Sequence, residues 1–169
     1  MQHHLTPRSP RQNGKQCTPQ KQKEYKVRDC QLSDLSYLAQ NIRKSDEEEL
    51  YAASGSDVIT CLFSGAMTSD YLKVATQEDN PFMIFGTSPQ GSVWMAGTPV
   101  LEKFTIPFLR FSKQYLSELH QKHELLWNYT DCRNHVPHRW LGWLGFTFIR
   151  KLPYGPFQKD FYEFARIGQ

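Results

Sequence analysis

The chain has 169 residues, which is enough for one domain with a substantial core and too few for two domains of ordinary size. No apolar run reaches the ~18 residues that a membrane span needs, and no signal peptide opens the chain, so we expect a soluble intracellular protein without a membrane partner. The cysteines lack the paired spacing of a disulfide framework, and we therefore expect free thiols in a reduced compartment: Cys17, Cys30, Cys61 and Cys132.

The net charge of +3 is distributed unevenly along the chain. Residues 1–28 carry seven Lys and Arg against one Glu, whereas the rest carries thirteen Lys and Arg against sixteen Asp and Glu. Residues 1–24 are rich in Pro, Gln, Lys and Arg, so we expect a basic, disordered arm before a folded domain over 25–169. Such an arm is either a solvated tail or a contact for nucleic acid or an acidic partner.

The first part of the domain is predicted to form one strand and three helices. The alternation of EYKVRDC, residues 24–30, favours a strand. Apolar residues at helical spacing follow, with Ser33 or Asp34 available as the N-terminal cap. The acidic run over 45–48 suits the first turn of a second helix, where the helix dipole favours carboxylates, and Asp57 can cap a third, apolar helix.

Three strands and a long helix are predicted next. Strands over 71–76, 82–86 and 92–96 are separated by turn sequences, which indicates an antiparallel meander. The Thr-Pro pair after the third of these strands suits the start of a helix over 100–123 with an apolar inner face. Because Pro107 lies inside this helix, we expect either a kink there or a start delayed by two turns.

Residues 124–151 are predicted to form a strand, a helix and a second strand with short linkers. The apolar, aromatic run over 125–129 suits a buried strand, and 131–134 is the turn that follows. Apolar residues then recur at helical spacing until Gly145, which can supply a left-handed C-terminal cap. The segment 146–149 resumes as a strand.

Two features complete the prediction for the C-terminal part. A turn over 152–156 precedes a last strand over 161–167. Trp140 and Trp143 cannot both face the same way on the short helix, so we expect one of them to be exposed, where it would suit a partner surface.

The helix of the 124–151 segment carries a pattern similar to one found in the GNAT acetyltransferase superfamily. In that superfamily the pattern is Asn, two residues, a small residue, three residues, Tyr, three residues and Gly-Phe. This chain has Asn134, Pro137, Leu141, Gly145 and Phe146 at these positions. The predicted order of elements is also the GNAT order. The resemblance implies an α/β (α+β) GNAT-like fold, with a mixed, mostly antiparallel sheet of about seven strands and helices on both faces.

The Tyr of the GNAT pattern is missing from this chain. In many active members that Tyr protonates the leaving thiolate of coenzyme A, and Leu141 stands in its place with no proton to give. If the protein is catalytic, another group must supply the proton. The candidates nearby in sequence are Tyr129, His135 and His138.

The resemblance also places a coenzyme site at the turn after the fourth strand. Active members carry Gln or Arg, two residues, Gly, one residue, and Gly or Ala there, and bare N–H groups hold the pyrophosphate. The corresponding contacts here are Met95, Ala96, Gly97, Thr98 and Lys103, together with Asn134 at the later helix. Of the glycine pattern this turn retains Gly97 alone; Pro99 removes one N–H, and Glu102 adds negative charge. We therefore expect weak or absent binding of acetyl-coenzyme A, and a plain Thr-Pro helix start explains the same residues.

Several histidines and one cysteine have spacings that a zinc site could use: His120, His123, Cys132, His135 and His138. A structural zinc site normally brings paired cysteines, which are missing here, so we predict no metal site. A nucleophile pair of Cys132 and His135 is disfavoured as well, because the two lie three residues apart at a strand-to-helix turn.

A narrower resemblance is to GNAT-like proteins of short-tailed phages, including internal virion protein A. The similar segments are VRDCQLSDLSYLAQNIRKSDEEELYA, SVWM and HRWLGWLGF. This resemblance implies a virion or host protein as partner, and a location in the host cytoplasm or the virion. Two hypotheses follow: a GNAT-fold binding or assembly protein with a degenerate acetyl-coenzyme A site, and an active N-acetyltransferase that acts on a host protein or small amine with a carboxylate or histidine as base.

Overall fold

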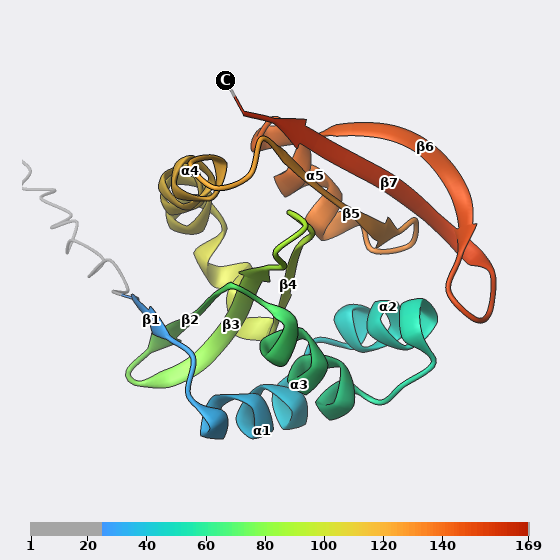
Figure 1. The fold of residues 1–169 in the computed structure, drawn as a ribbon. Coiled ribbons are helices and arrows are strands. Elements are labelled where there is room, and N and C mark those ends of the chain that lie inside the picture. Colours follow the sequence, from blue (N-terminus) through green and yellow to red (C-terminus); the bar gives the residue numbers. More distant parts are fainter. Residues whose placement is uncertain (1–24, 169) are drawn as a thin grey trace, which may run out of the picture.

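The computed structural model describes residues 25–168, apart from the side chains of residues 105–110. The predicted arm over 1–24 lies outside the described residues, as does Cys17. The elements follow the predicted order (Figure 1). They are β1 (Lys26–Asp29), α1 (Leu32–Asn41), α2 (Lys44–Ser54), α3 (Val58–Thr68), β2 (Tyr71–Gln77), β3 (Asn80–Thr87), β4 (Val93–Gly97), the 3-10 helix η1 (Pro99–Phe104), α4 (Thr105–His120), β5 (Leu125–Asp131), α5 (His135–Trp143), β6 (Thr147–Tyr154) and β7 (Lys159–Ile167).

The strands of this α+β fold form two antiparallel sheets that meet at one short contact. The first has the order β1-β2-β3-β4, and the second has the order β5-β7-β6. Where β4 and β5 begin, the Trp127 backbone N–H donates to the Gly91 carbonyl (3.1 Å). The side-chain amide of Asn128 donates to the Val93 carbonyl (2.7 Å). Beyond this point the two strands diverge (Figure 1).

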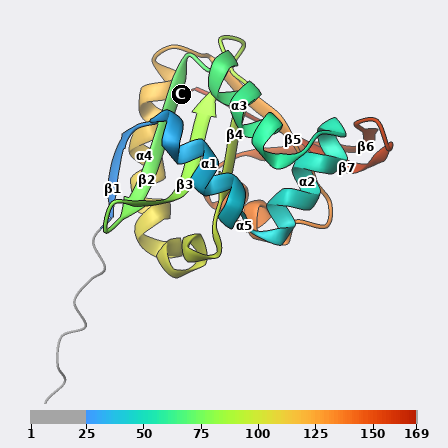
Figure 2. The same cartoon turned by 90° about the horizontal axis from the view of Figure 1, so that it is seen from below.

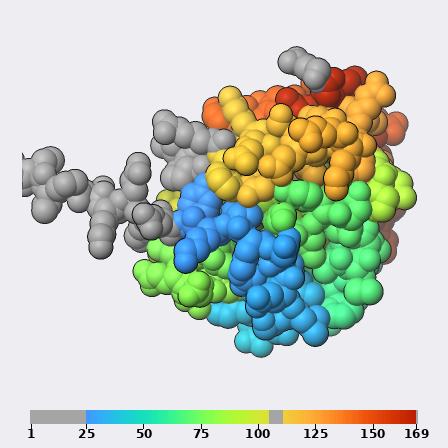
Figure 3. Space-filling model, turned by 60° about the vertical axis from the view of Figure 1, so that its left-hand side comes forward, coloured from blue at the N-terminus to red at the C-terminus, as the bar shows by residue number. Residues whose placement is uncertain are grey.

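Helices cover both faces of the first sheet (Figure 2). Alternate residues of β2 and β3 face opposite ways: Val74 and Ile84 pack with α1 and α3, whereas Ala75 and Met83 pack with η1 and α5. A third cluster joins α4 to the second sheet. The space-filling view shows α1 in blue and α4 in yellow to orange at the surface (Figure 3). Within residues 25–168, the helices are too short or too polar to cross a membrane.

The caps of α1 and α3 can be compared with the predictions. The cap of α3 is confirmed, because the Asp57 carboxylate accepts a hydrogen bond from the Thr60 N–H (2.9 Å). For α1 the prediction of Ser33 or Asp34 is wrong, because Gln31 occupies the cap position and Asp34 lies three residues later. From there the Asp34 carboxylate accepts from the Gln31 N–H (2.8 Å), as in a capping box.

The helix predicted over 100–123 is shorter and begins later. Residues Pro99–Phe104 form η1, and α4 runs from Thr105 to His120. Pro107 is therefore in the first turn of α4, where a missing N–H costs no intrahelical hydrogen bond. The delayed start is the observed outcome of the two that Pro107 allowed.

Only the end of the turn predicted over 152–156 is confirmed, because β6 continues through Pro153 to Tyr154 and residues 155–158 form the turn. Pro153 pairs with Asp160 of β7 in this hairpin, and an edge strand tolerates a residue without an N–H. The tight turn begins at Gly155, the residue after the end of β6, whose φ is +69°.

Two further expectations for the C-terminal part are confirmed. Gly145 has a φ of +83° directly after the end of α5. Trp140 is buried, whereas Trp143 is 45% exposed.

Candidate functional site

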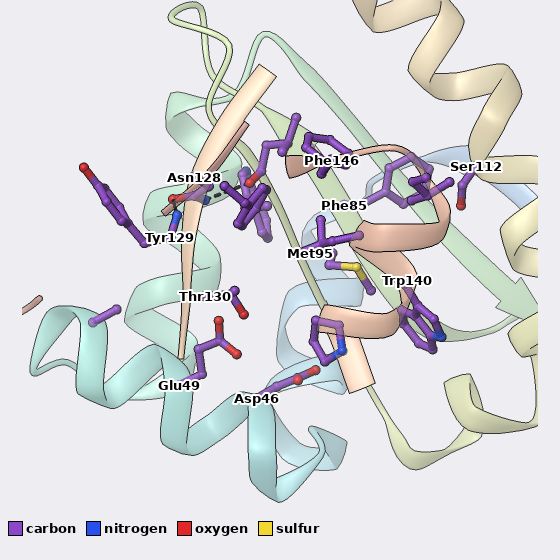
Figure 4. A pocket seen from close by; sticks show the side chains of 18 of the residues that line it. Asp46, Glu49, Phe85, Met95, Ser112, Asn128, Tyr129, Thr130, Trp140 and Phe146 are labelled. Carbon is purple, nitrogen blue, oxygen red and sulfur yellow. Dashed lines mark hydrogen bonds between the residues drawn. The ribbon is translucent and has the colours of Figure 1, made fainter. Parts of the chain in front are cut away.

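A cavity of about 240 Å³ lies in the space between the two sheets (Figure 4). Phe85 and Met95 line it from the first sheet, and Phe146 lines it where β6 begins. Leu116 of α4 and Leu141 of α5 add to a wall that is mostly apolar. One end of the cavity is different, because α2 brings two carboxyl groups to it.

Asp46 is the first of these carboxyl groups, and it is buried with 5% of its surface exposed. The Arg43 guanidinium donates to it twice, from Nη2 (2.6 Å) and Nε (3.2 Å). The Gly97 N–H donates to Oδ2 (2.9 Å), and the Asn134 amide donates to Oδ1 (3.2 Å). Asp46 therefore ties α2 to the end of β4 and to the start of α5.

The backbone N–H groups that follow β4 are used within the chain. The Gly97 N–H donates to the buried carboxylate just described, and the Thr98 N–H donates to a carbonyl of β3 (2.8 Å). Pro99 has no N–H. Thr98 accepts from the next two groups, the Val100 N–H at its hydroxyl (3.3 Å) and the Leu101 N–H at its carbonyl (3.0 Å). Each backbone N–H from residue 97 to residue 101 therefore already has an acceptor within the chain.

Glu49 is the second carboxyl group at this end of the cavity. Its two oxygens accept from the Asp131 N–H (3.1 Å) and from the Asn134 amide (2.6 Å). Burial raises the pKa of Glu49 to about 7, because the hydrogen bonds that favour the charged form offset only part of the desolvation. The buried Thr130 hydroxyl lies beside Glu49 but makes no hydrogen bond of good geometry (Figure 4). A carboxyl group of this kind can accept or release a proton near neutral pH.

Neither a family model nor a curated protein matches the sequence. Solved structures do match: the acetyltransferase of GNAT family from Streptococcus pneumoniae has a TM-score of 0.58 at 11% identity, over 86% of this chain and 100% of that chain. The chain has the GNAT fold. Ard1 from Thermoplasma volcanium, with the same fold, has a TM-score of 0.68 at 14% identity, over 86% of this chain and 98% of that one. The aminoglycoside acetyltransferase AAC(6')-Ib, solved in complex with coenzyme A, has a TM-score of 0.60 at 12% identity, over 85% and 95%.

The predicted coenzyme contacts occupy different environments in this GNAT fold. Met95 lines the cavity, whereas the Ala96 side chain is buried in the core on the α1 and α3 side. Gly97 and Thr98 lie at the end of β4 with their N–H groups already paired, and Lys103 is exposed on η1. The structure therefore brings Met95 to the cavity, whereas Ala96, Gly97, Thr98 and Lys103 are not part of its lining.

Asn134 occupies the N-cap position of α5. Its side chain makes no capping hydrogen bond. The amide instead donates to both Asp46 (3.2 Å) and Glu49 (2.6 Å), so it bridges the two carboxyl groups of α2. The residue that the GNAT pattern places at the start of this helix serves here to hold α2 in place.

The catalytic candidates are only partly gathered at the cavity. Tyr129 lines it, and its ring stacks on that of Tyr154 with 4.3 Å between the centroids. His135 is exposed, and His138 is held at its Nε2 by a carbonyl of β5 (3.0 Å), with its pKa lowered by burial. Neither histidine lines the cavity, whereas Leu141, the residue in place of the Tyr of the GNAT pattern, does.

One signal in the sequence points to three site residues that were not predicted, namely Arg43, Asp46 and Glu49. The three residues follow one another at intervals of three, which places them on one face of α2. That face continues to Leu50, which also lines the cavity. An acidic pair that continues an apolar face is a better candidate for a site than an acidic pair on a solvated face.

The possible metal and thiol sites of the sequence gain no support from the structure. Among residues 25–168, no group of three His, Cys, Asp or Glu side chains is placed to hold a metal ion. Cys30, Cys61 and Cys132 are free thiols, and burial raises the pKa of the Cys132 thiol. A raised thiol pKa opposes the thiolate form that a nucleophile needs.

Proposed function

We propose that this protein acts through binding and not through acetyl transfer, with a GNAT fold whose acetyl-coenzyme A site is degenerate. The observation that carries the proposal is the pairing of the backbone N–H groups after β4, from Gly97 to Leu101. The pyrophosphate of a coenzyme needs several such donors at once, because burying its charge without them is costly.

The charges at the end of β4 also disfavour coenzyme A. The Asp46 carboxylate already occupies the Gly97 N–H, and the Arg43 guanidinium donates to that carboxylate from Nη2 and Nε. Glu102 adds a second carboxylate, 3.9 Å from Arg43. A phosphate placed here would be repelled by the carboxylates of Asp46 and Glu102, and the donors that it needs already have other acceptors. The residues present therefore do not fit the coenzyme.

The partner in this proposal is a protein of a phage virion or of the host cell. The chain described here would act with it in the host cytoplasm or in the virion. Support comes from the likeness of three segments to phage GNAT-like proteins, and from an exposed aromatic residue on α5. Trp143 is 45% exposed, and the Lys113 ammonium lies 4.4 Å from its ring centroid. Exposed Trp residues are enriched among residues that dominate protein interfaces. In this proposal the basic arm over 1–24 adds a contact for nucleic acid.

A second candidate function is N-acetyl transfer with Glu49 as the general base. The observation in its favour is a carboxyl group at the end of an apolar cavity with its pKa raised to about 7. Such a group could take the proton of an attacking amine. This candidate lacks a hydroxyl group at Leu141, so Tyr129, which lines the cavity, would have to protonate the leaving thiolate.

An acetyl-transfer assay separates the two candidates. Labelled acetyl-coenzyme A is incubated with the wild-type protein or with Glu49→Gln, together with host-cell proteins or small amines as acceptors. The binding function predicts no incorporation above the protein-free background with either protein. Transfer by the wild type that falls by about 10²–10⁴-fold in Glu49→Gln, at an unchanged melting temperature, would establish the second candidate and refute the first.

A further inference from the structure

The hydrogen-bond donors around Asp46 form a nearly complete shell for an anion. Four N–H donations from three residues converge on one carboxylate: two from the Arg43 guanidinium, one from the Gly97 backbone and one from the Asn134 amide. Their lengths run from 2.6 to 3.2 Å. Arg43 and Asn134 are buried, with 3% and 4% of their surfaces exposed. Charge-assisted hydrogen bonds of this kind, away from water, are the strongest that a protein offers to an anion.

Contacts that do not involve the Asp46 carboxylate also hold these donors in place. The Arg43 N–H donates to the Gly97 carbonyl (2.9 Å), and the guanidinium carbon lies 5.8 Å from the centroid of the Trp140 ring. Asn134 is held by Glu49 at its amide (2.6 Å). Gly97 is paired with Met83 in the first sheet. The shell should therefore keep its shape when the carboxylate is taken away.

We propose that Arg43, the Gly97 N–H and Asn134 form a binding site for a small carboxylate anion, and that the Asp46 side chain is the ligand built into it. The inference deepens the proposed function and rests on it, because the Asp46 carboxylate takes up the Gly97 N–H, one of the donors that a coenzyme pyrophosphate would need. Asp46 is then a built-in occupant that keeps external anions out. If Arg43 and Asp46 formed only a structural ion pair, removing the Asp46 carboxylate would leave no site for an external anion.

Replacing Asp46 with Ala removes a carboxyl group and leaves a space that matches formate. In Asp46→Ala, Arg43 loses its carboxylate partner in a buried position, so we expect a lower melting temperature in chloride buffer. Sodium formate at about 0.1 M should raise that melting temperature by roughly 3–8 °C relative to sodium chloride of equal ionic strength. The wild type and Glu47→Ala, which removes an exposed carboxylate from the same turn of α2, should show no difference between the two salts.

The outcomes of this experiment are distinct from those of the proposed function. Equal melting temperatures of Asp46→Ala in formate and chloride would overturn the inference. If the variant is unfolded in chloride, the site predicts that it refolds in formate, and failure to refold would overturn the inference as well. Neither result requires acetyl-coenzyme A. Wild-type protein that transfers acetyl groups would refute the proposed function and leave the formate result as a separate question.

Discussion

Replacing Arg43 with Ala is expected to lower the free energy of unfolding by about 3–5 kcal/mol, the usual cost of removing one partner of a buried ion pair. The Arg43 and Asp46 side chains are 4% and 6% exposed. Without the guanidinium, the Asp46 carboxylate keeps the Gly97 N–H and the Asn134 amide but loses the compensating charge. Urea unfolding of the variant, followed by tryptophan fluorescence and circular dichroism, measures the loss.

Arg28→Ala is the matched control for this prediction. Arg28 and Asp34 also form a two-bond pair, at 2.7 and 2.9 Å, but the Arg28 side chain is 33% exposed. Because water screens this guanidinium, we expect its loss to cost about 1 kcal/mol. Equal losses for Arg28→Ala and Arg43→Ala would contradict the role given to burial.

The second large effect is expected for Gly155→Ala, at the turn between β6 and β7. Gly155 has a φ of +69°, and an added Cβ would meet the carbonyl oxygens of Ala52 and Ala53, the latter at 2.9 Å. Left-handed backbone alone costs a residue with a side chain roughly 1–2 kcal/mol, and the clash must also push the turn away from α2. We expect a total loss of about 2–4 kcal/mol in the same unfolding measurement.

Gly142→Ala is the control for this substitution, with an effect of opposite sign. Gly142 lies inside α5, and an added Cβ would meet no atom within 4 Å. Ala is favoured over Gly in a helix by about 1 kcal/mol, so this variant should be slightly more stable than the wild type. A Gly155→Ala protein as stable as Gly142→Ala would show that the turn does not pack on α2 as described.

The order of helices and strands could be predicted because it depends on local patterns. The alternation of residues 24–30, the Asp57 cap and the left-handed Gly145 are properties of short segments, and each was found where it was expected. The turn near Pro153 was misplaced for a related reason. Whether a proline ends a strand depends on whether its N–H would face a neighbour, and at the outer edge of the second sheet it does not.

The candidate site was harder to predict because its residues meet across long stretches of chain. Asn134 contacts Asp46 and Glu49 from 88 and 85 residues away. Its place at the start of a helix indicated a cap, since Asn is among the best capping residues, and no local signal pointed to the bridge. Similarly, the acidic run over 45–48 suits a solvated first turn, and only the position of α2 against β4 and β5 buries one side of it.

The titration of the wild-type protein with acetyl-coenzyme A tests the central claim most directly. The paired N–H groups from Gly97 to Leu101 predict no binding, or binding much weaker than the low micromolar range. Isothermal titration calorimetry should then give no saturable heat at micromolar concentrations of protein and coenzyme. A dissociation constant in the low micromolar range, about −8 kcal/mol, would contradict the claim that this GNAT fold has a degenerate coenzyme site.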